Sequence, residues 1–415
     1  MMSATPTIPG RRWRRGAILA AVVLALGFAG VVIRERSRTD RFLKDGESAL
    51  AAREYSQARE SFERYLAARP ADTHARLLAV RASRQAKAFG EARAHLKRYR
   101  DEGGDHEIAA IEEKLIRVQM GDESPLPALR DRARQDDEPA LAILEVLIQH
   151  DLDTYQLGLA LEGFTQYLAR RPGDLHACLG RGFVWERFLN FADAAEDYRR
   201  ATESHPNSER ARLKLAETLL IAGTPDEARV QFETLASQGG DRLPPVRLGL
   251  ARCYRKLARP ADAVALLDGL LAEYPEHGEV LWERGEIELE QGRPASAEPL
   301  LKKASLQRPH DRRVHYALSR CLLRLSRPVE AERHAARVRQ LDADLARLSE
   351  IRAELMKRPD DVELRCEGGV IFLKHGEREE GARWLQLALR LDPNRVDART
   401  ALRESELTQD RLSGK

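Results

Sequence analysis

The sequence has few aromatic residues and little cysteine. Of its 415 residues, 6% are Phe, Trp or Tyr, and four are Cys. It also lacks the runs of Val, Ile, Thr and Tyr between turn residues that are typical of β-strands. Long stretches instead combine Ala, Leu, Glu and Arg, and charged residues make up 33% of the chain. These features predict an all-helical protein.

Charge of one sign is not in excess over most of the chain. The 69 basic and 66 acidic residues leave a net charge of +3. Because the first 38 residues are strongly basic, the remainder is slightly acidic. Sequence-independent binding to nucleic acid depends on cations that neutralise phosphates. The charge balance therefore argues against a nucleic-acid partner.

Motifs that carry chemistry are absent as well. The sequence contains no Gly-rich phosphate loop, no H-E-x-x-H, no G-x-S-x-G and no acidic calcium loop. The four cysteines lie far apart in the sequence, at Cys178, Cys253, Cys321 and Cys366. His315 and His334 lack the flanking ligands of a metal site, which favours a role in helix packing. We therefore expect no cofactor, no metal site and no catalytic activity.

A long uncharged stretch lies near the amino terminus. Residues 16–33 contain 18 residues without a charge, preceded by four Arg within residues 11–15 and followed by further basic residues. As a helix this stretch would span about 27 Å, close to the roughly 30 Å hydrocarbon core of a bilayer. It predicts an uncleaved transmembrane anchor behind a basic tail of residues 1–15. A cleaved signal peptide is the alternative.

Basic residues on both sides of this stretch leave its orientation nearly balanced. A short arginine-rich tail crosses a membrane less readily than a long domain does. The preference for Arg over Lys is typical of GC-rich bacterial coding. We therefore expect a single-pass protein with a cytoplasmic amino terminus and a periplasmic body. A cytoplasmic body is the alternative.

The remainder of the chain repeats with a period of 34 or 35 residues. A proline ends most units, at Pro70, Pro172, Pro206, Pro275, Pro309 and Pro393. Twelve residues before this slot, most units carry alanine, at Ala58, Ala92, Ala160, Ala194, Ala228, Ala263, Ala297 and Ala331. Proline ends a helix because it lacks the N–H and clashes with the preceding turn. Alanine allows two helices to approach closely.

These units resemble tetratricopeptide repeats, which follow the pattern W-x2-L-G-x2-Y, then A-x3-F, then P. The unit at 175–208 matches at Gly182, Trp185, Phe191, Ala194, Tyr198, Ala201 and Pro206. The unit at 39–72 matches at Phe42, Gly46, Tyr55, Ala58, Phe62 and Pro70. The resemblance covers about nine tenths of the chain. It implies an all-α, right-handed superhelical solenoid of about nine to ten antiparallel helix pairs, of a bacterial type with an N-terminal membrane anchor.

The phase of the repeat predicts how the body is organised. We expect a nine-unit array at 39–343, an extra helix and linker at 344–361, a final unit at 362–395, and a capping helix and tail at 396–415. Within the array, the unit at 107–140 is degenerate, since Lys114 takes the small-residue slot. The extra helix follows from the spacing of Leu345, Leu348, Ile351 and Leu355.

The resemblance also implies a protein or peptide ligand on the concave face, which the first helix of each repeat lines. The residues that fall in its groove-facing slots between 244 and 324 are Arg252, Arg255, Trp282, Glu286, Arg313, Tyr316, Arg320 and Arg324. Those of the 312 unit share one helix face. Such a stripe could bind an acidic segment, with an aromatic anchor beside it. Solvated arginines are the competing interpretation.

Three functions are compatible with this sequence. The first is a non-catalytic, membrane-anchored scaffold that binds proteins. The second is an accessory subunit that binds a polysaccharide- or lipid-modifying envelope enzyme or its glycan. The third is an enzyme with a site in the degenerate unit, where polar residues cluster at His106, Glu107, Glu112 and Glu113. A solvated helix face explains that cluster better, so we favour the scaffold. The sequence predicts neither the partner nor the oligomeric state.

Overall fold

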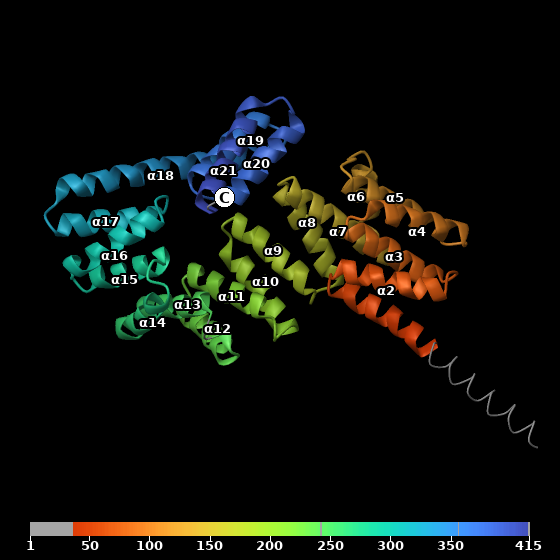
Figure 1. Cartoon of the computed structure of the whole chain (residues 1–415), viewed down its shortest axis with the longest axis horizontal. Helices are drawn as coiled ribbons and strands as arrows, with labels where there is room; N and C mark the ends of the chain where they lie inside the picture. Colours follow the sequence, from red (N-terminus) through yellow and green to blue (C-terminus); the bar gives the residue numbers. More distant parts are fainter. Residues whose placement is uncertain (1–35, 241–242, 356, 414–415) are drawn as a thin grey trace, which may run out of the picture. The chain divides into compact units, whose positions relative to one another are not determined.

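The computed structural model describes residues 36–240, 243–355 and 357–413, and all the regular secondary structure in these ranges is helical (Figure 1). This confirms the predicted all-α class. The predicted anchor at 16–33 lies outside the described residues, and no helix within them is long and apolar enough to cross a membrane. Internal contacts divide the chain into unit 1, residues 1–150, and unit 2, residues 151–415.

Unit 1 begins with a helix at residues 36–51. The helices that follow are α2 (Tyr55–Ala68), α3 (Thr73–Gln85), α4 (Phe89–Asp101), α5 (His106–Gln119), α6 (Leu126–Arg132) and α7 (Glu138–Asp153), which extends into unit 2. The predicted degenerate unit keeps a full first helix, α5, but its second helix, α6, has seven residues. Gly121, at a φ of +96°, and Pro125 precede α6, so the chain turns before this helix begins.

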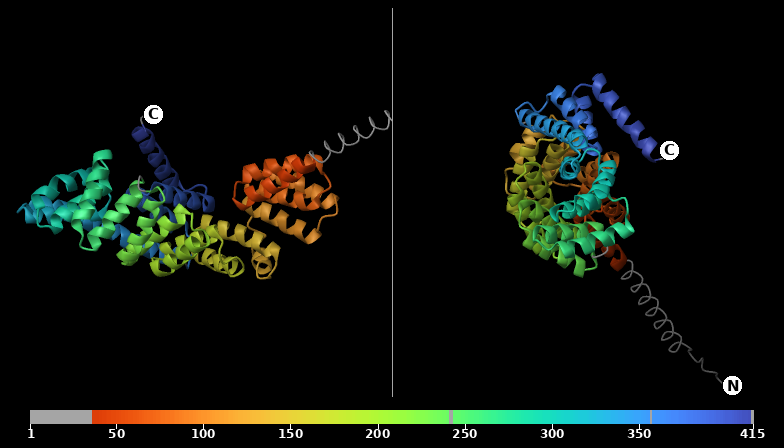
Figure 2. Two further views of the ribbon diagram at one scale, coloured as in Figure 1. Left: turned by 90° about the horizontal axis from the view of Figure 1, so that it is seen from below. Right: turned by 90° about the vertical axis from the view of Figure 1, so that its left-hand side faces the viewer.

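Unit 2 continues as a row of helix pairs (Figures 1 and 2). Its helices are α8 (Leu157–Arg170), α9 (Leu175–Arg187), α10 (Phe191–Ser204), α11 (Glu209–Ala222), α12 (Pro225–Ser237), α13 (Pro244–Lys256), α14 (Pro260–Glu273), α15 (Gly278–Glu290), α16 (Pro294–Gln307), α17 (Arg312–Arg324), α18 (Pro328–Leu355), α19 (Val362–Lys374), α20 (Arg378–Leu391) and α21 (Val396–Ser413). The first helices of successive repeats contact one another, as α11 does α13, α13 does α15, and α15 does α17.

Small residues hold neighbouring helices close together, both within a repeat and between consecutive repeats. All eight alanines of the repeating slot are at most 1% exposed. Gly249 of α13 lies so close to α12 that a Cβ atom would come within 2.2 Å of the ring of Phe232. Gly182 of α9 approaches Tyr198 of α10 in the same way, at 2.5 Å. Because interiors are packed at crystal-like density, these positions accept no larger side chain without a shift of the helices.

Asp or Ser marks the start of many first helices. The side chains of Asp72, Asp105, Asp174, Ser208 and Asp361 each accept a hydrogen bond from the backbone N–H three residues further on. The first N–H groups of a helix have no partner within it, and such N-caps satisfy one of them. The caps therefore fix where each repeat begins after its proline.

Polar side chains replace the pattern's tryptophan at the fourth position of several first helices. There the side chain donates to the carbonyl oxygen of the proline six residues earlier, as in Arg76 to Pro70, Arg212 to Pro206, His315 to Pro309, Arg365 to Pro359 and Arg399 to Pro393. Arg212 and His315 make these bonds at 2.9 and 3.0 Å. A carbonyl group beyond a helix end needs a partner. These four arginines and His315 thus tie their proline turns to the repeats that follow.

Helix α18 differs from the predicted organisation. It runs without a break for 28 residues, from Pro328 to Leu355. The residues expected to form a separate helix within 344–361 are its C-terminal half. The reason is local: Ala343 occupies the slot where other units carry proline, and residues 329–355 contain neither Pro nor Gly. Helix α18 therefore joins two repeats as one rod of about 42 Å.

Candidate functional site

The predicted binding residues lie on three neighbouring first helices of unit 2. Helix α13 carries Arg252 and Arg255, α15 carries Trp282 and Glu286, and α17 carries Arg313, Tyr316, Arg320 and Arg324. We call the surface that these eight residues share the groove face. Contacts of α15 with α13 and with α17 bring the residues together.

Ion pairs connect α13 to α15. Arg252 contacts two carboxylates, with Nη2 2.5 Å from Glu279 Oε1 and Nε 2.6 Å from Glu283 Oε1. Arg255 also bridges two, with Nε 3.0 Å from Glu283 Oε2 and Nη1 2.7 Å from Glu290 Oε1. The side chain of Glu283 is 3% exposed. A buried carboxylate is tolerated when it is paired in this way.

A second set of contacts connects α15 to α17. Arg320 Nη1 lies 3.6 Å from Glu286 Oε2, and Arg313 Nη2 lies 3.4 Å from Glu279 Oε1. Arg324 Nη1 donates to the carbonyl oxygen of Leu289 at 2.5 Å. This bond satisfies a carbonyl in the last turn of α15.

The arginines of the groove face are therefore not a row of unpaired positive charges. The sequence interpretation missed Glu279, Glu283 and Glu290, which supply most of their carboxylate partners. The spacing of these residues and Glu286, at intervals of four, three and four along α15, is the signal that could have found them. Burial raises the pKa of Glu286, although Arg320 and Arg255 oppose it. Burial also opposes ionisation of Glu279, but Arg252, Arg308 and Arg313 hold the pKa of Glu279 below its usual value.

Aromatic and apolar groups on the groove face differ in accessibility. Trp282 is 8% exposed, and the guanidinium of Arg313 lies 4.4 Å from its ring centroid. Tyr316 is 50% exposed, with Arg320 at 5.5 Å from its ring. Leu323, seven residues or two helical turns beyond Tyr316 on α17, is 57% exposed and was not among the predicted residues. Tyr316 and Leu323 are thus the side chains that a ligand could contact, while Trp282 is buried beneath the groove face.

A carboxylate beside this face predicts a dependence of stability on pH. Hydrogen bonds from Arg293, against the opposing effect of burial, and from Arg284 lower the pKa of Glu288 on α15 to about 2. A lowered pKa contributes stability above the unfolded value near 4.5, which is lost as the pH falls from there toward 2. We expect Glu288→Gln to lower the free energy of unfolding by at most about 3 kcal/mol at pH 7.

Urea unfolding of the wild type and of Glu288→Gln at pH 7, 5 and 3 measures this effect. The difference between the two proteins should shrink as the pH falls below 5. A difference that stays constant down to pH 3 would contradict the role given to Glu288.

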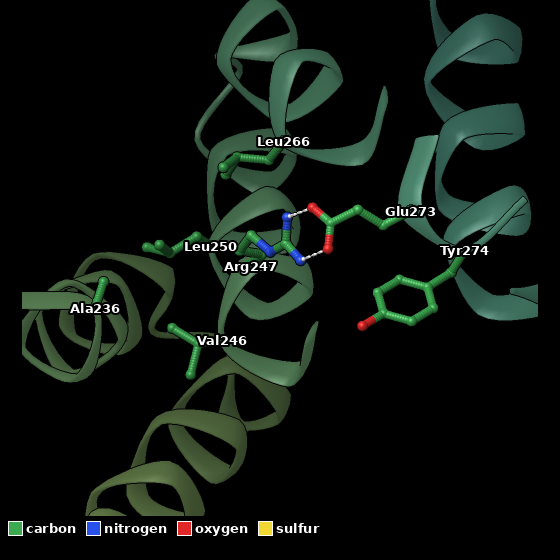
Figure 3. Close-up of a pocket in the computed structure, with 7 residues that line it drawn as sticks. All are labelled: Ala236, Val246, Arg247, Leu250, Leu266, Glu273 and Tyr274. Carbon is green, nitrogen blue, oxygen red and sulfur yellow. Dashed lines mark hydrogen bonds and ion pairs between the residues drawn. The ribbon is translucent and has the colours of Figure 1, made fainter. Parts of the chain in front are cut away.

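A separate pocket lies between α12, α13 and α14 (Figure 3). Its volume is about 740 Å³, and its lining residues are Ala236, Val246, Arg247, Leu250, Leu266, Glu273 and Tyr274. Arg247 and Glu273 form two hydrogen bonds of 2.6 and 2.8 Å at its side, as Figure 3 shows. The pocket contains none of the residues predicted to bind a partner.

The polar cluster considered as a hidden active site in unit 1 has structural partners. Glu112 is 1% exposed and accepts hydrogen bonds from Arg81 and Arg84, both at 3.0 Å. Glu107 pairs with Arg132 at 2.9 Å. These contacts join α5 to its neighbours α3 and α6. The geometry therefore gives both carboxylates a role in packing.

The four cysteines and the pair His315 and His334 lie on packed helices. Within the described ranges, no group of three or more His, Cys, Asp or Glu side chains is placed to hold a metal ion. The four cysteines are free and buried. Burial raises the pKa of Cys253 to about 12, which makes its thiol a poor nucleophile. His315 Nδ1 lies 3.0 Å from His334 Nδ1, so this pair connects α17 to α18.

Sequence profiles identify the repeats. One profile described as tetratricopeptide repeat matches residues 49–115 and 288–355, and a second with the same description matches residues 186–241 and 248–305. Together they cover more than half of the chain. The chain belongs to the tetratricopeptide-repeat family. Proteins of this family are scaffolds for protein interactions. The comparison with curated proteins found no match.

Solved structures with similar folds include proteins described as tetratricopeptide-repeat proteins. One from Parabacteroides merdae has 19% identity and a TM-score of 0.36, over 68% of this chain and 98% of its own. PilW, a type IV pilus biogenesis factor, has 18% identity and a TM-score of 0.42, over 51% of this chain and 96% of its own. A protein of Thermus thermophilus has 18% identity and a TM-score of 0.34, over 56% and 99%. At these identities and TM-scores, the similarities carry no information about the partners of this chain.

Proposed function

We propose that this tetratricopeptide-repeat protein is a non-catalytic scaffold that binds a protein segment on the groove face of unit 2. The observation that supports the proposal is the surface of α17. There the half-exposed Tyr316 and the exposed Leu323 lie beside Arg320 and Arg324. Tyrosine and arginine are among the residues that are enriched in the binding hot spots of protein interfaces.

The ion pairs of the groove face suggest the chemistry of the partner. Arg320 is 3.6 Å from Glu286, a longer separation than in the pairs of Arg252. Burial also raises the pKa of Glu286, so its surroundings disfavour the charged form that pairs with the arginine. A carboxylate on the ligand could replace it and form a bidentate contact. We therefore expect a segment with an apolar side chain and at least one acidic residue.

A photo-crosslinking experiment tests the binding face in cells. A photoreactive residue at Leu323 should crosslink to a protein partner, and the additional change Tyr316→Ala should reduce the yield at least tenfold. Leu306 of α16, which is 79% exposed, serves as the control position. Equal crosslinking from Leu306 and Leu323, or a yield that Tyr316→Ala does not change, would refute the proposed face.

The proposed scaffold is attached to a membrane by residues 16–33, with the repeats in the periplasm. The support is the uncharged length of this stretch and its arginine-rich flanks. Reporter fusions after Lys415 test the orientation, since one reporter works only outside the cytoplasm and the other fluoresces only inside it. Activity of the inner reporter would place the repeats in the cytoplasm.

A polysaccharide- or lipid-modifying enzyme as the crosslinked partner would favour the alternative function, that of an accessory subunit.

A further inference from the structure

The two ends of unit 2 contact each other. Arg365 Nη2 of α19 donates to the carbonyl oxygen of Thr154, in the turn between α7 and α8, at 3.2 Å and across 211 residues of sequence. The ring of Tyr155 in the same turn packs edge-on against Trp384 of α20, with 5.0 Å between ring centroids. We call these two interactions the closing contact. In a repeat array, each repeat usually contacts only its neighbours along the chain. The closing contact therefore adds a constraint on the two ends of unit 2 that contacts between neighbouring repeats do not supply.

The closing contact is buried and mainly apolar. Trp384 is fully buried, and Tyr155 packs against the cluster that contains Ile351 and Phe372. Among the described residues, the buried hydroxyl of Tyr155 has no hydrogen-bond partner. The aromatic ring of Tyr155 therefore carries the contact, and its hydroxyl does not.

A weaker ion pair lies at the same junction. Arg187, at the end of α9, lies 3.7 Å from Glu380 of α20. Glu380 also accepts a hydrogen bond from Trp384 Nε1 at 3.1 Å. Arg187 thus contacts the carboxylate that orients the tryptophan, and it does so from the second repeat of the unit.

Helix α18 links the groove face to the closing contact. Its N-terminal half packs on α17, where Ser319 Oγ donates to the carbonyl oxygen of Ala331 at 3.0 Å. Its C-terminal half contributes Leu348, Ile351 and Leu355 to the cluster that holds Tyr155. Figure 1 shows α18 extending from α17 to α19. Because the helix has no break, a displacement at one end is transmitted to the other.

We propose that the closing contact is a conformational device that sets the geometry of the groove face through α18. Unit 2 has a closed form, in which Tyr155 is seated against Trp384, and an open form, in which α19 and α20 have left the turn after α7. Opening moves α18 and loosens its packing on α17. A partner that binds the closed groove face therefore strengthens the closing contact, and the coupling is reciprocal. This effect on binding rests on the proposed function, whereas the closing contact itself does not.

Hydrogen exchange of the full chain, measured by mass spectrometry without any partner, tests the device. In Tyr155→Ala we expect exchange at least tenfold faster in α19 and α20, and also faster in α17 and α18. Tyr155→Phe is the matched control, since it keeps the ring and removes a hydroxyl without a partner. Its exchange should stay within twofold of the wild type. Circular dichroism checks that each variant is folded.

A second variant keeps the test decisive if Tyr155→Ala does not fold. Arg187→Ala removes the ion pair to Glu380 and should accelerate exchange in the same helices, by about threefold. Arg199→Ala, which breaks the exposed pairs of Arg199 with Glu196 on α10 and Glu227 on α12, should not. Unchanged exchange in α19 and α20 would refute the closing contact as a constraint. Faster exchange there with no change in α17 would refute the coupling. Equal acceleration of all helices of unit 2 would indicate general destabilisation and would also refute it. Because no partner is present, each result is independent of the crosslinking experiment.

Discussion

Replacing Glu112 with alanine is expected to destabilise unit 1 by about 3–5 kcal/mol. Glu112 and Arg84 are each 1% exposed, and their side chains are 3.0 Å apart. Removal of the carboxylate leaves the guanidinium of Arg84 buried without its charged partner. Such an uncompensated charge costs more than the intact pair gains. Hydrogen exchange of α3 and α5 in the full chain measures the loss.

The double variant Glu112→Leu with Arg84→Leu is the control for this prediction. Replacing both members of a buried pair by apolar groups is often neutral, so the double variant should be more stable than Glu112→Ala. Arg81, which also contacts Glu112, is 19% exposed and can reach solvent. A double variant as unstable as the single one would mean that the shape of the site matters more than its charges. If Glu112→Ala lost an activity but kept its stability, the result would favour a catalytic site in this unit.

Replacing Trp384 with alanine is expected to cost about 3–5 kcal/mol in the last repeat. Its side chain is fully buried and fills the space above Gly368, where a Cβ atom would lie 2.5 Å from the indole. The substitution leaves a large cavity among Phe372 and Tyr155, which pack edge-on against the ring. The local loss should appear as faster exchange in α19 and α20 and as an early unfolding step in urea.

The variant Trp384→Phe separates volume from hydrogen bonding. It keeps most of the apolar volume and loses the bond to Glu380, so it should cost about 1–2 kcal/mol. Trp185 of α9 offers a matched position, since it is only partly buried. Trp185→Ala should therefore cost less than Trp384→Ala. Equal costs at the two positions would contradict the central place of Trp384 in the cluster.

Much of the fold could be predicted from individual residues. Each proline that ends a unit precedes a turn, and each alanine of the repeating slot is buried, because both act on the nearest helices. The division into pairs follows from a local rule that holds within about 34 residues. The same rule failed at Ala343, where the absence of proline allowed α18 to continue.

The candidate site was less accessible to sequence reasoning. Slot positions identified Arg252 and Arg320 as residues of the groove face, but not the glutamates that pair with them. Those pairs join residues 27 to 35 positions apart, and their geometry depends on how neighbouring first helices are offset. The exposure of Leu323 and the burial of Trp282 depend on the same offset. Whether the face binds a partner stays a prediction.

The sequence by itself determined the repeat, its helix pairs and their small-residue contacts, since these depend on residues close together along the chain. The tertiary structure decided which charges pair across α13, α15 and α17, and that Tyr155 meets Trp384. The physical reason is that small rotations between successive repeats add up along an array. The contact between its ends depends on their sum, and no single repeat encodes that sum.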